Sequence, residues 1–210
     1  MNDDLIRQLV FDLKPVERLT SPAQRTAQFA VPVAALTLAS TWLAGVRADL
    51  LLKLHEPAYV AETGILLALF MLGTFATFSS GVPGVRLRPA AWGLGLFASA
   101  WLFLAGIRCF VAPAAFGLTS GIACVHRTLL LGVVPTSVLF IMLRRSVPLA
   151  AGTSGALVMT SAGALAILGT RAVCGKDDGL HVLVWHVVPL ALLVLLGSVL
   201  GRAWFRYASR

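Results

Sequence analysis

Acidic side chains are scarce in this sequence, and its long apolar stretches lack them altogether. Only 9 of the 210 residues are Asp or Glu, against 17 Lys and Arg. Proton-coupled pumps and ion carriers usually need an ionisable group at membrane depth. We therefore expect that no acid lies inside a membrane span, and that the protein is neither a pump nor an ion carrier.

The motifs of common enzymes are missing as well. The sequence contains no Walker loop, no HExxH, no GxSxG and no paired carboxylates. Its three cysteines form no CxxC pair, which a quinone-linked disulfide oxidoreductase would normally need. We therefore expect no enzymatic activity. The alternative is a membrane thiol-redox protein related in layout to the quinone-linked disulfide oxidoreductases.

What the sequence has in abundance is hydrophobic residues. They make up 58% of the chain, charged residues only 12%, and the mean hydropathy is +0.87. The stretch between Arg25 and Arg47 has 21 residues without a charge, enough to cross about 30 Å of hydrocarbon. Similar stretches predict an all-α polytopic membrane protein, a bundle of six transmembrane helices. The expected spans are 28–46, 63–80, 89–107, 121–143, 153–170 and 181–200, and residues 47–62 are expected to form a polar loop.

The positive charges indicate how the bundle sits in the membrane. The net charge is +8, but the charges lie in short clusters between apolar runs, so we expect a lipid bilayer and no nucleic acid as partner. Six spans put both termini on one side. That side would hold eleven Lys and Arg residues and the other side six. The positive-inside rule then predicts that both termini are cytoplasmic.

One short segment differs from the rest, and we expect two domains: a cytoplasmic tail at 1–26 and a transmembrane domain at 27–210. Apolar residues recur in the tail at helical spacing, and Lys14-Pro15 ends the pattern. A short amphipathic helix is marginal alone in water, so its apolar stripe must dock. The candidates are a partner protein, the membrane surface or the rest of the chain. The stripe consists of Leu5, Ile6, Leu9, Val10 and Leu13.

Cysteines and histidines gather at the predicted outer level of the bundle. Thiols and imidazoles bind soft and borderline metal ions, and two thiols can also form a disulfide. The alternative is that they only pack and hydrogen-bond, because no tight CxxC or HxxxH spacing is present. A haem or metal protein using His181 and His186 is disfavoured, since residues five apart do not share a helix face. The six residues are Cys109, Cys124, Cys174, His126, His181 and His186.

Small residues indicate how the spans pack. Gly197 and Gly201 form a GxxxG pattern in the last span. In lipid such residues let helices approach closely. We expect them to pack helices within the chain, and a homodimer through the last span is the alternative.

Two blocks of sequence carry a resemblance to a known family. The N-terminal block, DDLIRQLVFDLKPVERL, is close to the pattern D-x-L-I-x-x-L-x-x-D-L-x-P-V. The second block comprises Cys124, then LRRSVPLAAGTSG, Cys174, the acids Asp177 and Asp178, VWHVVP and GSVLGR. With its six hydrophobic segments, the chain resembles the NrsF family of bacterial inner-membrane anti-sigma factors. It departs from the family pattern at Gly175, where proline usually follows the cysteine.

The resemblance implies a partner, a sensor and a location. The tail would hold an extracytoplasmic-function (ECF) sigma factor at the inner membrane and release it on a periplasmic thiol-reactive signal, an oxidant or a heavy metal. Cys124 and Cys174 would form the sensor, with auxiliary roles for His126, His181 and His186. Cys109 matches no family position, and no cofactor is expected beyond a transient heavy metal ion. The residues implied in sigma-factor binding are Asp4, Leu5, Ile6, Leu9, Asp12, Leu13, Pro15 and Val16.

Overall fold

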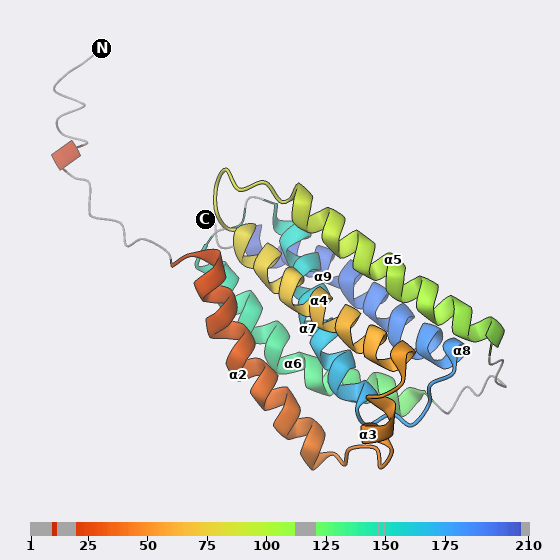
Figure 1. Ribbon diagram of the computed structural model, residues 1–210. Helices are drawn as coiled ribbons and strands as arrows, with labels where there is room; N and C mark the ends of the chain where they lie inside the picture. Colours follow the sequence, from red (N-terminus) through yellow and green to blue (C-terminus); the bar gives the residue numbers. More distant parts are fainter. Residues whose placement is uncertain (1–9, 12–19, 112–120, 147, 149, 207–210) are drawn as a thin grey trace.

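The computed structural model describes residues 10–11, 20–111, 121–146, 148 and 150–206. In this part of the chain the only regular elements are helices, and six of them are long and apolar enough to cross a membrane. This confirms an all-α polytopic membrane protein (Figure 1). The helices are α2 (Pro22–Leu43), α3 (Leu50–Lys53), α4 (Pro57–Ser79), α5 (Arg88–Val111), α6 (Ile122–Arg144), α7 (Ala151–Arg171), α8 (Gly179–Val182), the π-helix η2 (Leu183–Val187) and α9 (Val188–Arg206).

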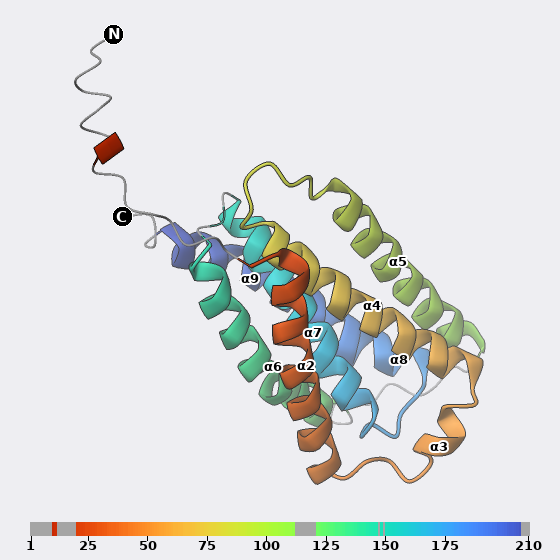
Figure 2. The ribbon, with the colours of Figure 1, turned by 60° about the vertical axis from the view of Figure 1, so that its left-hand side comes forward.

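The long helices run side by side in one bundle with two distinct ends (Figures 1 and 2). We call the end where α2 begins and α6 and α9 finish the terminal end. The opposite end holds α3, α8 and the start of α6. Helices α8, η2 and α9 follow one another without a break and form the sixth span, Gly179–Phe205.

Helix α2 begins at Pro22, six residues before the predicted position 28. Ser21 and Gln24 form a capping box, in which each side chain accepts a hydrogen bond from the other's backbone amide, both at 3.2 Å. The prediction was wrong because Arg25 was treated as a loop residue. In the fold Arg25 is buried and donates to the carbonyl oxygen of Met142 and to Ser146 Oγ, both at 2.7 Å.

Helix α4 begins at Pro57, where sequence reasoning expected a loop as far as residue 62. Proline suits the first turn of a helix, because the amide that it lacks would have no partner there. Glu62 therefore lies inside α4 and is buried. The expectation that no acid lies within a span was wrong at this residue. The four later spans agree with their predicted bounds to within about five residues at each end.

Helix α7 is the centre of the bundle and contacts α2, α4, α6 and α9. Hydroxyl pairs connect it to two of these neighbours. Ser161 and Ser154 pair with α4, and Thr170 pairs with α6. Lipid provides no hydrophobic drive between helices, so such pairs and close packing hold a membrane bundle together, at about 0.6 kcal/mol per hydrogen bond. The oxygen distances are 2.6 Å for Thr74–Ser161, 2.8 Å for Ser80–Ser154 and 3.0 Å for Thr128–Thr170.

Helices α7 and α9 cross at three glycines. A side chain on Gly155 would overlap the backbone of Gly197 and Gly201, and a side chain on either of those would meet α7 in turn. The two glycines of the GxxxG pattern thus lie at a contact inside the chain.

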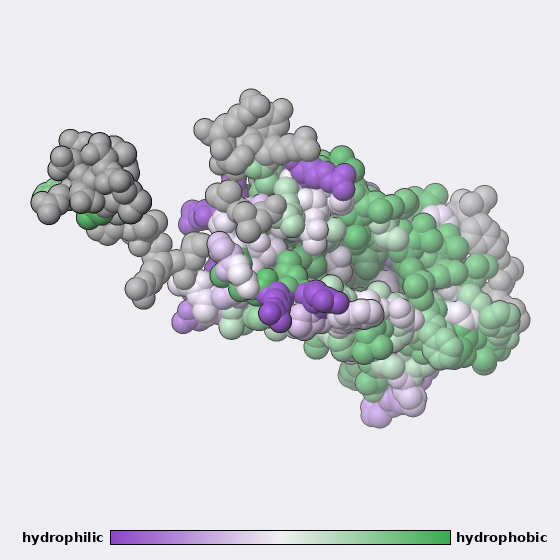
Figure 3. Space-filling view, turned by 90° about the horizontal axis from the view of Figure 1, so that it is seen from above, coloured by the Kyte–Doolittle hydropathy of each residue, from purple (hydrophilic) through white to green (hydrophobic). Residues whose placement is uncertain are grey.

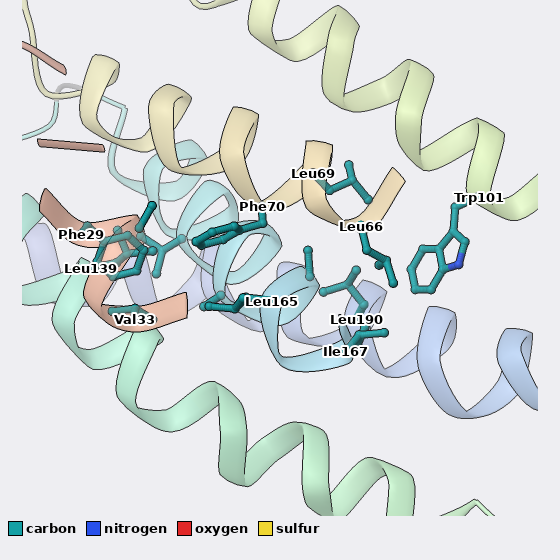
Figure 4. Close-up of a cluster of buried hydrophobic side chains, with 14 of the residues drawn as sticks. Phe29, Val33, Leu66, Leu69, Phe70, Trp101, Leu139, Leu165, Ile167 and Leu190 are labelled. Carbon is teal, nitrogen blue, oxygen red and sulfur yellow. The ribbon is translucent and has the colours of Figure 1, made fainter. Parts of the chain in front are cut away.

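Apolar side chains from all six long helices fill the interior. Figure 4 shows part of this cluster, with side chains pointing from α2, α4, α5, α6, α7 and α9 toward one another. Large hydrophobic residues also cover the outside of the bundle, as membrane helices require. In Figure 3 hydrophobic residues dominate most of the visible flank, and hydrophilic residues gather toward one end.

Candidate functional site

Two cysteines that lie fifty positions apart meet at the opposite end of the bundle. Cys124 is in the first turn of α6, and Cys174 is in the loop between α7 and α8. Their sulfur atoms are 3.3 Å apart, and the thiol of Cys124 donates to that of Cys174. Both side chains are buried, and neither is in a disulfide. The structure thus brings together the two thiols that sequence analysis assigned to a sensor.

His181 completes a triangle with the two thiols. Its Nε2 lies 3.6 Å from Cys124 Sγ and 3.4 Å from Cys174 Sγ. Asp178 fixes the start of α8, because its carboxylate accepts a hydrogen bond from the His181 backbone amide at 2.8 Å. The cap therefore holds His181 over the sulfur atoms.

His186 joins the cluster through the π-helix. In an α-helix, residues five positions apart point about 140° away from each other, which is why sequence reasoning kept His181 and His186 apart. Hydrogen bonds from residue i to i+5 in η2 change this register. The two rings then lie 5.5 Å apart between centroids, at 61°. The expectation that these histidines cannot share a face was wrong for this reason.

The four side chains form one buried group. One ligand atom from each of Cys124, Cys174, His181 and His186 lies within 4.8 Å of all the others. His186 is completely buried, and neither of its ring nitrogens makes a hydrogen bond of ordinary length in the described part of the chain, although the Cys174 thiol is near enough to interact with the ring. Two thiols and two imidazoles in this arrangement can form a disulfide or coordinate a metal ion.

The other residues considered from sequence lie outside this group. His126 is exposed on α6, and Cys109 is half-buried near the end of α5. Neither is part of the cluster of ligand atoms. The roles of all these residues stay predictions.

Charged side chains hold the loop that carries Cys174. We call the group of Arg47, Lys53, Arg171 and Asp177 the clamp. Arg47 donates to the carbonyl oxygen of Cys174 at 2.8 Å and makes two hydrogen bonds to the Asp177 carboxylate, at 2.8 and 2.9 Å. Arg171 also donates to Asp177, at 2.8 Å, and Lys53 lies 3.1 Å from the same carboxylate. Three cations from three segments thus converge on Asp177, which fixes the position of Cys174.

The clamp continues into the bundle through Glu62. Its carboxylate accepts hydrogen bonds from Arg108 of α5 at 2.9 Å and from Arg171 of α7 at 3.0 Å. A buried carboxylate needs such partners, because leaving one charge unpaired destabilises a fold strongly. Glu62 therefore joins α4, α5 and α7 directly beside the loop of Cys174.

The surroundings also shift the acidity of two loop residues. The hydrogen bond from the Cys124 thiol, helped by His181, lowers the pKa of the Cys174 thiol below its ordinary value. Burial would raise the pKa of Asp177, but the hydrogen bonds from Arg47 and the charge of Arg171 outweigh it and hold that pKa well below its usual range. A lowered pKa favours the thiolate form of Cys174, and the thiolate is the nucleophile and the metal ligand.

Sequence reasoning missed the clamp and the role of Glu62. It assigned Arg47, Lys53, Glu62, Arg171 and Asp177 to polar loops, where charges are usually solvated. The signal that could have found them is their number: five charges near predicted span ends, of both signs, at one level of the bundle. Charges at such depth are normally paired.

The residues predicted to bind a sigma factor lie outside the described part of the chain. This applies to Asp4, Leu5, Ile6, Leu9, Asp12, Leu13, Pro15 and Val16.

Comparison with protein-family models identifies a family that this chain matches. A family model described as "NrsF: Negative regulator of sigma F" matches residues 9–207, almost the whole chain. No curated protein and no solved structure matches.

Proposed function

Because the chain belongs to the NrsF family of negative regulators of sigma F, we propose that it is an inner-membrane anti-sigma factor with a thiol sensor. It binds an ECF sigma factor through residues 1–26 and releases it when an oxidant or a heavy metal reaches Cys124 and Cys174 from the periplasm. The observation that carries the sensor is the 3.3 Å separation of the two buried sulfur atoms.

The charge pattern supports this orientation. Arg86, Arg88, Arg144, Arg145 and Arg202 are exposed at or near the ends of helices at the terminal end. Basic residues favour the cytoplasmic side. Reporter fusions at Lys53 and Lys176 should then read periplasmic, and a fusion at Ser146 should read cytoplasmic. A periplasmic reading at Ser146 would refute the orientation.

Either signal changes the same contact. An oxidant takes two electrons from the two thiols, two protons leave, and the sulfur atoms bond at about 2.05 Å. A metal ion displaces the thiol protons and binds both sulfur atoms. In both cases the start of α6 becomes tied to the loop after α7.

Helix α6 supports a route from the thiols to the tail. Cys124 lies at one end of α6 and Met142 eighteen residues further on, about 27 Å along the axis. Arg25 of α2 donates to the Met142 carbonyl oxygen there. The tail leads directly into α2, so a shift of α6 reaches the segment that precedes Pro22.

The tail would bind through its apolar stripe, as amphipathic helices bind grooves. Leu9→Asp places a charge in the middle of that stripe, and burying an unpaired charge should weaken binding by several kcal/mol. Arg7→Ala on the polar face is the matched control. The test uses the full-length protein and the sigma factor that residues 1–26 capture. Equal binding by both variants would show that the stripe is not the contact surface.

The sensor is tested by release of the captured sigma factor. The reduced protein in nanodiscs, loaded with that sigma factor, is treated with a thiol oxidant or with Cd²⁺. We expect release from the parent and from Cys109→Ser, and none from Cys124→Ser or Cys174→Ser. Release from both single variants would refute the paired-thiol sensor. A parent that binds no sigma factor but exchanges disulfides with a quinone would favour the redox alternative.

A further inference from the structure

We propose that Cys124, Cys174, His181 and His186 together form a four-coordinate site for one divalent d¹⁰ ion, Zn²⁺ or Cd²⁺, with His186 as a full ligand. This inference rests on the proposed function in one respect only, namely that metal binding at the site would release the sigma factor. The binding itself depends on four side chains and needs no sigma factor.

The donor set is the first argument. Two thiolates and two imidazoles are a common ligand set of structural zinc sites, and a tetrahedral S₂N₂ set indicates zinc or an iron–sulfur centre. Two thiolates also neutralise the charge of a divalent ion, so the complex can remain buried. Harder ions such as Mg²⁺ and Ca²⁺ prefer oxygen ligands, and no carboxylate belongs to this cluster of ligand atoms.

The spacing of the donor atoms is the second argument. A tetrahedral ion with metal–sulfur bonds of about 2.3 Å sets its sulfur atoms about 3.8 Å apart. Here the sulfur atoms are 3.3 Å apart, and His181 Nε2 lies 3.4 and 3.6 Å from them. An ion can therefore enter the triangle of Cys124, Cys174 and His181 with a movement of about half an ångström. The His186 donor atom lies within 4.8 Å of the other three and would have to move closer by up to about 1.5 Å.

His186 is the third argument, because packing alone does not explain it. A completely buried imidazole without a hydrogen-bond partner loses the free energy of its hydration and gains nothing in exchange. A disulfide between the cysteines would leave both of its nitrogens unsatisfied. A metal ion would satisfy one of them directly.

The π-helix is the fourth argument. Single-turn π-helices inside α-helices are rare and occur frequently at functional sites. In this chain η2 spans Leu183–Val187, and its register brings His186 to the face of His181. The irregular turn thus completes the ligand set.

The test measures metal binding by the reduced full-length protein in nanodiscs. Cd²⁺ binding is followed by the ultraviolet absorption of Cd–thiolate bonds, and Zn²⁺ binding by competition with a chromophoric chelator. We expect one ion per chain in the parent. Cys124→Ser, Cys174→Ser, His181→Ala and His186→Leu should each weaken binding at least tenfold, because even residues behind the ligands contribute about 10–100-fold.

Two controls and one rescue separate a ligand from a packing residue. His126 and Cys109 lie outside the cluster, so His126→Ala and Cys109→Ser should bind the metal ion as tightly as the parent does. His186→Cys keeps four donors and should restore binding that His186→Leu loses. If His181→Ala and His186→Leu both bind Cd²⁺ as tightly as the parent, the site consists of two thiols only. If the parent binds no ion, the inference is wrong.

The same preparations distinguish the two proposals. Tight metal binding, with no release of the captured sigma factor by either Cd²⁺ or a thiol oxidant, would support the metal site and refute the proposed sensor. Release by an oxidant, with no metal binding, would refute the metal site and leave the anti-sigma function standing.

Discussion

At the scale of single residues, Asp177 holds more contacts than its place in a loop suggests. Arg47 and Arg171 are almost completely buried, and both make hydrogen bonds to its carboxylate. Removing the charge leaves two buried guanidinium groups with fewer partners. We therefore expect Asp177→Asn to reduce the free energy of unfolding by about 1–3 kcal/mol. Thermal unfolding in detergent measures this change.

Asp49→Asn is the matched control, because Asp49 pairs with the same Arg47 but is 45% exposed. An exposed ion pair contributes little to stability, so Asp49→Asn should have a much smaller effect than Asp177→Asn. Equal effects of the two substitutions would show that Asp177 does not fix the loop.

The lowered pKa of Asp177 predicts a pH dependence. The unfolded chain takes up a proton near pH 4, whereas the folded carboxylate keeps its charge to lower pH. Its contribution to stability is therefore complete above about pH 4 and is lost as the pH falls below that value. The difference in Tm between the parent and Asp177→Asn should be constant from pH 7 to 5 and shrink below pH 4. A difference that grows on acidification would contradict this account.

At the scale of helices, uncharged stretches were enough to predict the six spans. The starts of α2 and α4 were missed because Arg25 and Glu62 look like loop residues until their partners are known. Those partners lie far away in the sequence. The meeting of Cys124 and Cys174 at one level followed from the topology. The approach of His186 could not be predicted in this way. It depends on the π-helical hydrogen bonds of η2, which residue spacing in the sequence does not reveal.

The crossing of α7 and α9 gives a prediction at this scale. A Cβ atom at Gly155 would overlap the Gly197 carbonyl oxygen, which is rigid backbone. Gly155→Ala should therefore reduce stability by about 1–3 kcal/mol, as overpacking does. At Gly95 of α5 a Cβ atom meets nothing within 4 Å, so Gly95→Ala should stabilise its helix by about 0.5–1 kcal/mol. Thermal unfolding of both variants measures these changes. If Gly155→Ala leaves the stability unchanged, the helices do not cross at these glycines.

At the scale of the whole molecule, α2 is fastened at both ends. Arg25 connects its start to α6, and Arg47, four residues beyond its end, connects to the loop of Cys174. The two segments that carry the thiols therefore contact α2 at its start and the segment directly after its end.

Arg25→Ala tests this connection. It removes both hydrogen bonds to the end of α6 and the contact of the guanidinium group with the Phe78 ring, 4.5 Å away. The thiols should still react, as counted with a thiol reagent, while release of the captured sigma factor on oxidation should fall at least tenfold. Arg86→Ala, an exposed arginine at the same end, should behave as the parent does. If Arg25→Ala releases the sigma factor normally, the route runs elsewhere.

The burial of the four-residue cluster also sets how fast the proposed sensor would respond. Cys124 is 6% exposed and Cys174 5%, and the loop that carries Cys174 is held through Asp177. A reagent reaches the sulfur atoms only while that loop is open, so the response rate is the frequency of opening multiplied by the chance of capture during each opening. At low concentrations this chance is small, and brief exposures pass without effect. In the proposed sensor the charged residues that hold the loop would therefore slow the reaction of the thiols, and the response would follow the accumulated dose of a reagent rather than its momentary concentration.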